Sequence, residues 1–200
     1  MGNRMVAGAM HGVRSRSVGL AALLLAVSAL AAQAQTALTL GTGFGVTIPV
    51  GDAADFVSTG WHAQANLGLT NPDWPVGVRL DGMYHTLGGE DLGAGLESAG
   101  LDVIAGTLNL QLFLSRNDTG GGFFVTGGGG FYNLDSGDDE GLIETESVTK
   151  AGILGGLGYK FGMTNLRLAL EGKFHHIFTE NNATQLIPIT ILVEIPLGGN

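Results

Sequence analysis

The chain has 200 residues, a net charge of −9 at pH 7, 35 glycines and no cysteine. This length allows a single domain, the acidic balance excludes nucleic acid as an expected partner, and disulfides cannot stabilise the fold. The glycines follow no collagen period and lie inside apolar segments, where each would weaken a helix by about 1 kcal/mol relative to alanine. The composition therefore favours β-strands.

The N-terminal segment has the three parts of a secretory signal peptide. A basic stretch precedes an apolar run over residues 18–32, and Ala-Gln-Ala at 32–34 supplies the small-x-small pattern that a signal peptidase accepts. We expect residues 1–34 to be a signal peptide that is cleaved between Ala34 and Gln35. The alternative is an uncleaved anchor, although a membrane span needs roughly 20 apolar residues and this run is shorter. Because the basic stretch is long, Met5 and Met10 are alternative start sites.

Eight segments of the remaining chain, residues 35–200, alternate apolar and polar side chains with the period of two that is typical of β-strands. Each is close to the roughly 9–11 residues that a tilted transmembrane strand needs. In the fifth segment, which contains a glycine run, we assign Phe123, Val125 and Phe131 to the outward face. The eight segments are residues 37–48, 60–69, 76–85, 104–114, 123–134, 150–161, 166–175 and 187–195.

The connections between these segments alternate in length. The short ones, rich in Gly, Asn, Asp and Pro, are residues 71–73, 116–120 and 162–165. The long ones are residues 49–58, 87–100, 135–146 and 178–185. Short turns at one end and long loops at the other are typical of outer-membrane barrels, whose short turns are periplasmic. The sequence therefore predicts an all-β fold, an eight-stranded antiparallel up-and-down transmembrane barrel.

Charge indicates which face of each strand points at lipid. On each strand, one face carries Leu, Ile, Val and aromatic residues with no formal charge, and the other face carries the charged residues. Because a lipid-facing Arg or Lys at the bilayer midplane costs roughly 2–4 kcal/mol, the charged face is expected to point inward. The charged residues on the polar faces are Arg79, Asp81, Lys150, Lys160, Arg167, Glu171, Lys173 and Glu194, whereas Arg116 lies in a turn.

A soluble exported barrel would also alternate, with its apolar face inside. Three features favour the membrane version: the alternation of turns and loops, glycines on the polar face, and aromatic residues near strand ends, where interfacial girdles belong. These aromatic residues are Trp61, Trp74, Tyr84, Phe123, Tyr159 and Phe161.

Three stretches resemble the small eight-stranded outer-membrane β-barrel family, the opacity-protein-like barrels. Residues 171–178 (EGKFHHIF) and 185–191 (QLIPITI) resemble its closing strands, and residues 124–131 (FVTGGGGF) resemble its fifth strand. The resemblance implies an outer-membrane protein of a Gram-negative envelope within the porin-like superfamily. Members of the family usually end on an aromatic residue that the assembly machinery reads, whereas this sequence ends in Gly-Gly-Asn.

A barrel of eight strands is only wide enough for side chains to fill it, so open conduction is not expected. An unpaired charge inside would be costly, and we expect the inward charges to form a structural ionic network. The alternative is a gated or leaky path for protons or ions. The expected network comprises Arg79, Asp81, Lys150, Arg167, Glu171, Lys173 and Glu194.

The long loops are acidic, which favours a solvated surface; the sharper alternative is a divalent-cation site or a cation-bridged contact with lipopolysaccharide. Residues 135–140 bring carboxylates close together but lack the spacing of an EF-hand loop. The acidic loop residues are Asp52, Asp55, Glu90, Asp91, Glu97, Asp135, Asp138, Asp139, Glu140, Glu144, Glu146 and Glu180.

An enzymatic site is not indicated by the residues. Some barrels of this size are lipid A deacylases with a His-x-Ser-Asn-Ala run, but here Phe178 stands where the serine would be, after His176 and Ile177. A hydrolase needs a nucleophile within reach of its base, and none assembles. We expect His175 to be an interior polar residue and His176 an interfacial one, since strand neighbours point to opposite faces.

No phosphate-binding loop, dinucleotide fingerprint or zinc spacing is present. The sequence therefore predicts a non-enzymatic outer-membrane protein, either a structural envelope component or a scaffold for acidic loops. It is expected to have no catalytic, cofactor-binding or metal-binding residue. Its expected partners are outer-membrane lipid, lipopolysaccharide and the assembly machinery, and a monomer is expected. The alternatives are an outer-membrane lipid A or phospholipid hydrolase and a soluble periplasmic ligand-binding barrel.

Overall fold

The structure is a computed structural model that describes residues 37–71, 73–93, 96–117, 121–136, 147–163, 166–179 and 183–197. The expected signal peptide at 1–34, with its cleavage site between Ala34 and Gln35, lies outside the described residues. Within the described residues, no helix is long and apolar enough to cross a membrane.

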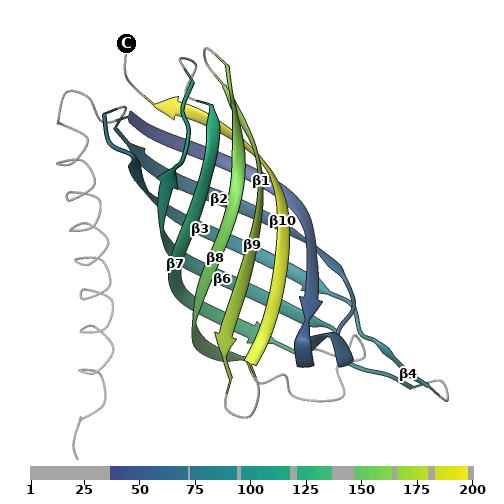
Figure 1. Cartoon of the computed structure of the whole chain (residues 1–200). Coiled ribbons are helices and arrows are strands. Elements are labelled where there is room, and N and C mark those ends of the chain that lie inside the picture. The colour runs from purple at the N-terminus through teal and green to yellow at the C-terminus, as the bar shows by residue number, and fades with distance from the viewer. Residues whose placement is uncertain are drawn as a thin grey trace, which may run out of the picture. The chain divides into compact units, whose positions relative to one another are not determined.

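Eight antiparallel strands close into a barrel (Figure 1). Each strand pairs with the next barrel strand along the chain, and β10 closes the barrel against β1. The predicted eight-stranded up-and-down barrel is therefore confirmed. The barrel strands are β1 (Ala37–Val50), β2 (Gly60–Thr70), β3 (Val76–Leu87), β6 (Leu101–Phe113), β7 (Gly122–Asp135), β8 (Val148–Gly162), β9 (Arg167–Phe178) and β10 (Ala183–Leu197).

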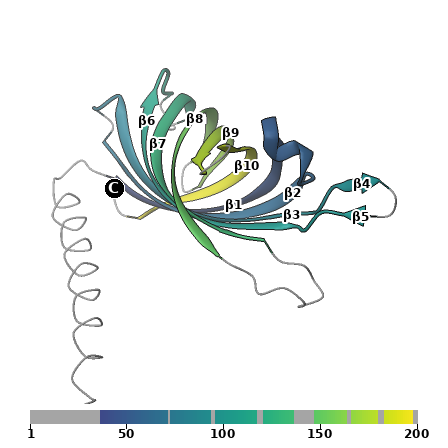
Figure 2. The same ribbon diagram turned by 90° about the horizontal axis from the view of Figure 1, so that it is seen from below.

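The strands extend further than the apolar pattern predicts, because backbone pairing does not require apolar side chains. The connection between β9 and β10, expected to be a long loop over 178–185, is only residues 179–182. Two features inside long connections were not predicted: the 3-10 helix η1 (Gly51–Asp55) after β1, and a hairpin of β4 (Asp91–Gly93) and β5 (Leu96–Glu97). Figure 2 shows this hairpin projecting beyond the barrel wall.

The connections β2–β3, β6–β7 and β8–β9 lie at one end of the barrel, hereafter the turn end, and the connections β1–β2, β3–β6, β7–β8 and β9–β10 lie at the other, hereafter the loop end. At the turn end, the Asp73 backbone N–H donates to Asn71 Oδ1 at 2.9 Å, and the Gly121 N–H donates to Asn117 Oδ1 at 2.6 Å. In each of these two turns, an asparagine side chain thus accepts a hydrogen bond from a backbone N–H. Gly122 has a φ of +149°, and a Cβ there would overlap the Ser115 carbonyl, so only glycine fits where β7 begins.

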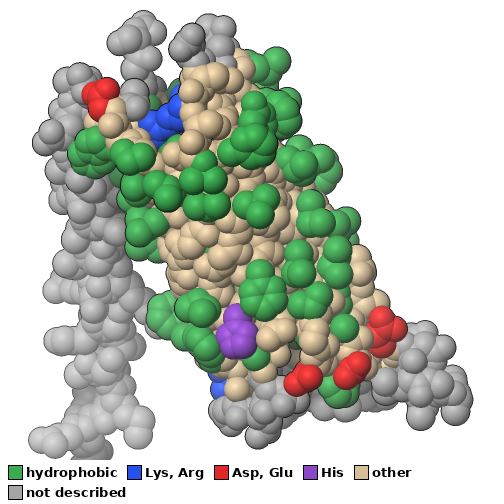
Figure 3. Space-filling view, viewed as in Figure 1, with side chains coloured by type: hydrophobic (Ala, Val, Ile, Leu, Met, Phe, Trp, Pro, Cys, Tyr) green, Lys and Arg blue, Asp and Glu red, His purple; other side chains and the backbone are tan. Residues whose placement is uncertain are grey.

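The barrel wall has inverted polarity, with large apolar side chains outside and charged ones inside. Phe44, Phe131 and Leu157 expose 69%, 69% and 67% of their surface, whereas Arg79 and Glu171 expose 1% and 0%. Figure 3 shows hydrophobic side chains scattered over the visible wall, with the coloured charged side chains toward its two ends. A soluble barrel would have the opposite arrangement, so this wall is suited to lipid.

The glycine run in β7 does not disturb the alternation. Phe123, Val125 and Phe131 are exposed, as predicted, while Phe124 and Tyr132 are buried inside. A Cβ added at Gly130 would overlap the carbonyl oxygen of Gly106. Glycine is therefore required at this inward position, where the β6 backbone leaves no space for a side chain.

Candidate functional site: the barrel lumen and wall

An ionic cluster of Arg79, Asp81, Glu171 and Lys173 crosses the middle of the lumen. Residues two apart on one strand share a face, so β3 presents the first two and β9 presents the last two. Arg79 Nε donates to Asp81 Oδ1 at 2.7 Å, and Arg79 Nη2 donates to Glu171 Oε2 at 2.7 Å. Lys173 Nζ lies 2.7 Å from Asp81 Oδ2 and 3.4 Å from Glu171 Oε2. Two cations thus face two carboxylates, and the four fully buried charges balance.

A second ion pair lies nearer the turn end. Lys160 Nζ donates to Glu194 Oε2 at 2.8 Å, with both side chains buried. The Lys160 ammonium also lies 5.5 Å from the ring centres of both Phe113 and Phe124, within cation–π range. The partner of Glu194 is therefore Lys160, a residue outside the expected network.

The seven residues of the expected network are thus divided by the structure. Four form the ionic cluster, and Glu194 belongs to the second pair. Lys150 and Arg167 lie near strand ends and are half-buried; their cross-strand neighbours are Tyr132 and Glu194. The strand alternation assigns all seven to the inward face, but their height along the barrel depends on strand register, which separates them.

A histidine layer lies between the ionic cluster and the loop end. Thr47 Oγ1 is 2.9 Å from His62 Nδ1 and 2.8 Å from His85 Nδ1, and Tyr132 OH is 3.0 Å from His175 Nδ1. All three histidine side chains are fully buried. His62 and His85 are direct cross-strand partners on the neighbouring strands β2 and β3, whereas His175 joins them from β9, which is far away in the chain. The described residues include no group of side chains that could hold a metal ion.

An apolar plug closes the lumen at the loop end. Its members come from four strands and the segment after η1, and Ala53, Leu101 and Leu134 pack against it. The side chains are at most 6% exposed, so the plug separates the histidine layer from the loops. The plug consists of Val57, Leu87, Val103, Ile177 and Leu186.

On the outside, aromatic residues lie near both ends of the barrel. Trp61 and Tyr84 pack edge to face at 5.8 Å toward the loop end. Toward the turn end, the ring centres of Phe123 and Phe161 each lie 4.7 Å from the ring centre of Tyr159. Such rings prefer the boundary between hydrocarbon and water, so the two groups mark the edges of a lipid-facing band.

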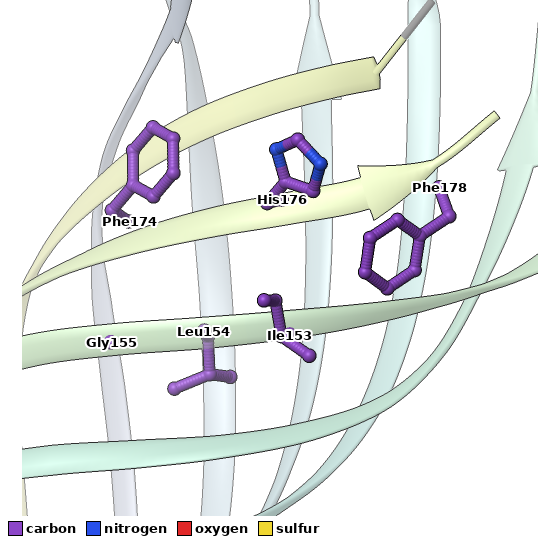
Figure 4. A pocket seen from close by; sticks show the side chains of 6 residues that line it. All are labelled: Ile153, Leu154, Gly155, Phe174, His176 and Phe178. Atoms are coloured by element: carbon purple, nitrogen blue, oxygen red, sulfur yellow. The ribbon is translucent and has the colours of Figure 1, made fainter.

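A wall groove of about 410 Å³ opens on the outer face, where β8 and β9 run side by side (Figure 4). His176 lies in it on β9, and its Nδ1 is 3.3 Å from Gln185 Nε2. His176 therefore contacts an amide and not a hydroxyl nucleophile. His175 faces the lumen and His176 the wall, as expected. The groove is lined by Ile153, Leu154, Gly155, Phe174, His176 and Phe178.

Few of the acidic loop residues can be located. Asp52 and Asp55 are exposed on η1, and Glu90 and Asp135 are half-buried at strand ends. The structure describes the backbone but not the side chains of Asp91 and Glu97. The expected acidic residues outside the described part of the chain are Asp138, Asp139, Glu140, Glu144, Glu146 and Glu180.

A closed barrel of eight strands, with a filled polar lumen and an apolar wall between aromatic belts, defines a transmembrane β-barrel protein of the outer-membrane type. Solved structures with a similar fold are also outer-membrane proteins. Neisserial surface protein A matches with a TM-score of 0.54 at 9% identity, over 81% of this chain and 97% of that one. A major outer membrane protein from Thermus thermophilus matches with a TM-score of 0.56 at 14% identity, over 81% of this chain and 99% of that one.

A third solved structure is the Yersinia pestis outer membrane protein Ail in a phospholipid bilayer nanodisc. It matches with a TM-score of 0.51 at 12% identity, over 80% of this chain and 100% of that one. No protein-family model and no curated protein matches the chain. The resemblance to small eight-stranded outer-membrane barrels is thus confirmed at the level of the fold, and fold and wall polarity agree with the expected location in the outer membrane.

Proposed function

We propose that this protein is a non-enzymatic component of the outer membrane, a closed barrel that spans the lipid and holds acidic loops at the cell surface. The observation that carries the proposal is the inverted polarity of the barrel, with balanced charges buried inside and large apolar side chains outside. Water cannot solvate such a wall favourably, whereas hydrocarbon can. In this arrangement the turn end faces the periplasm and the loops face outward.

The filled lumen supports a structural role over transport. The ionic cluster crosses the middle of the barrel and the apolar plug closes the loop end. An ion entering the lumen would have to displace paired buried charges and then cross the plug, both at high cost. We therefore assign the interior charges to holding the strands in register.

The geometry gives little support to a hydrolase. The Thr47 hydroxyl has the histidine neighbours that a nucleophile requires, His62 and His85, but all three are completely buried below the plug. On the wall, His176 hydrogen-bonds Gln185. The soluble ligand-binding barrel is disfavoured because its apolar face would have to line the lumen.

The proposal extends to processing and partners. Residues 1–34 would be removed as a signal peptide, and residues 35–200 would be inserted by the outer-membrane assembly machinery. The barrel sheet itself is closed, so none of its eight strands offers an unpaired edge to a second copy, which supports a monomer. The exposed Asp52 and Asp55 on η1 would lie beside lipopolysaccharide, where divalent cations can bridge carboxylates and phosphates.

Planar-bilayer recording tests the closed lumen. The purified barrel, inserted into a lipid bilayer, is expected to give no stable single-channel openings in roughly molar salt, because the cluster and plug fill the path. A porin of known conductance inserted in the same membrane is the control. Discrete, long-lived openings that scale with salt concentration would contradict a structural role and favour transport.

A further inference from the structure

The wall groove has features that ordinary lipid contact does not explain. Gly155 on β8 lines the groove, and Gly127 lies directly opposite it on β7, both on the outward face. A Cβ at Gly155 would approach only the Thr126 carbonyl oxygen, at 4.0 Å, and one at Gly127 only the Leu154 carbonyl oxygen, at 3.9 Å. Packing inside the barrel therefore does not require glycine at either position. Instead, these glycines leave space on the lipid side.

Aromatic side chains of β9 line one side of this space. Phe174 lies directly across from Gly155, and Phe178 lies two positions beyond His176 on the same face. The rings of His176 and Phe178 pack edge to face with centres 5.1 Å apart. Because the groove opens on the lipid-facing wall and its other lining is apolar, it is suited to a lipid acyl chain.

His176 gives the groove a polar end. The Gln185 amide nitrogen only donates, so in this hydrogen bond His176 Nδ1 is the acceptor, which leaves Nε2 as the nitrogen that can carry the ring proton. Among the described residues, the ring hydrogen-bonds Gln185 through Nδ1 and packs edge to face with Phe178. The residue is half-buried and outward-facing two positions before the loop end of β9, so in the membrane orientation proposed above it lies on the headgroup side of the wall. An N–H on this side of the wall can donate to a lipid headgroup, which carries the acceptors that hydrocarbon lacks.

We propose that the wall groove is a binding site for one phosphate-bearing lipid of the loop-side leaflet, with its acyl chain over Gly155 and a phosphate oxygen accepting from His176 Nε2–H. A hydrogen bond to the charged phosphate is stronger than one to a neutral ester. The site therefore selects by headgroup, whereas the remaining wall selects only for hydrocarbon. The inference rests on the membrane location proposed above and adds a ligand to it.

Native mass spectrometry of the barrel in maltoside micelles tests the site with two probes, a phosphatidylglycerol and a diacylglycerol with the same chains. The wild-type protein is expected to retain one phosphatidylglycerol about tenfold more tightly than the diacylglycerol. His176→Leu should remove this preference, and Gly155→Leu should weaken both adducts. His176→Gln, which keeps an N–H donor, should retain part of the preference.

Gly82→Leu is the matched control, because Gly82 also faces outward on its strand and a Cβ there meets nothing within 4 Å. It should leave both adducts unchanged. Equal losses in Gly155→Leu and Gly82→Leu, or an unchanged headgroup preference in His176→Leu, would overturn the site. Each variant is first checked for the heat-dependent gel mobility of a closed barrel. If the wild-type protein passes this check but shows no selective adduct, the lipid site is refuted and the membrane barrel stands.

Discussion

Replacement of Arg79 by methionine is expected to lower the free energy of unfolding by about 3–5 kcal/mol. Arg79 donates to both carboxylates of the ionic cluster, to Asp81 at 2.7 and 2.9 Å and to Glu171 at 2.7 and 2.8 Å. Without it, the two fully buried carboxylates would share a single cation of the cluster, the ammonium of Lys173, although the Asn109 amide would still donate to Asp81. Urea unfolding of the micelle-embedded barrel, followed by the fluorescence of its two tryptophans, measures the loss.

The double variant Arg79→Met with Glu171→Gln is the matched control. It removes one cation and one anion, so the buried charges balance again and most of the lost stability should return. This comparison separates charge imbalance from the loss of arginine packing. A cost of less than about 1 kcal/mol for the single variant, the range of exposed ion pairs, would mean that the cluster is solvated and not buried.

Introducing a charge on the outer wall is the second change with a large expected effect. Leu108 lies in the middle of β6 and exposes 58% of its surface. Leu108→Arg is expected to cost about 2–4 kcal/mol in lipid vesicles, because arginine at the bilayer midplane loses its hydration. Unfolding titrations in vesicles measure this cost.

Leu114→Arg provides the control for depth. Leu114 exposes 64% but lies just beyond the turn end of β6, where an arginine reaches water and should cost about 0–1 kcal/mol. Similar costs at the two positions would mean that the exposed wall is not embedded in hydrocarbon. The contrast between the two variants thus measures the depth of the lipid-facing band.

Alternation alone was sufficient to predict the facing of the strands. Arg79 and Asp81 are two residues apart, as are Glu171 and Lys173, so a period of two places each pair on one face. Their location inside also followed from the sequence, since charge on the lipid face is too costly. These local rules predicted the barrel and the residues that line it.

Alternation could not predict which inward side chains pair with each other across the lumen. Whether Glu194 meets Lys160 or Lys173 depends on the relative heights of strands, which are set by register around the closed barrel. The histidine layer illustrates the same limit: His62, His85 and His175 meet only after β2, β3 and β9 are aligned. The wall groove could not be predicted because Gly155 and Phe174 become neighbours only through the pairing of β8 with β9.

The connections were predicted least accurately. The β9–β10 loop is shorter than expected because pairing continues through polar residues such as Thr184 and Gln185, whose backbone bonds do not depend on hydrophobicity. The strands β4 and β5 are three and two residues long. Strands this short show no apolar alternation, so the sequence pattern could not predict their hairpin.

Gel mobility in SDS, with and without boiling, tests the central claim of a closed transmembrane barrel most directly. The protein is extracted from the membrane fraction and run unheated beside a boiled sample. A closed barrel resists SDS until it is heated, so we expect the unheated protein to migrate at a different position and to move to its unfolded position on boiling. Identical mobility in the two lanes, with the protein released in the periplasmic wash, would contradict the membrane barrel.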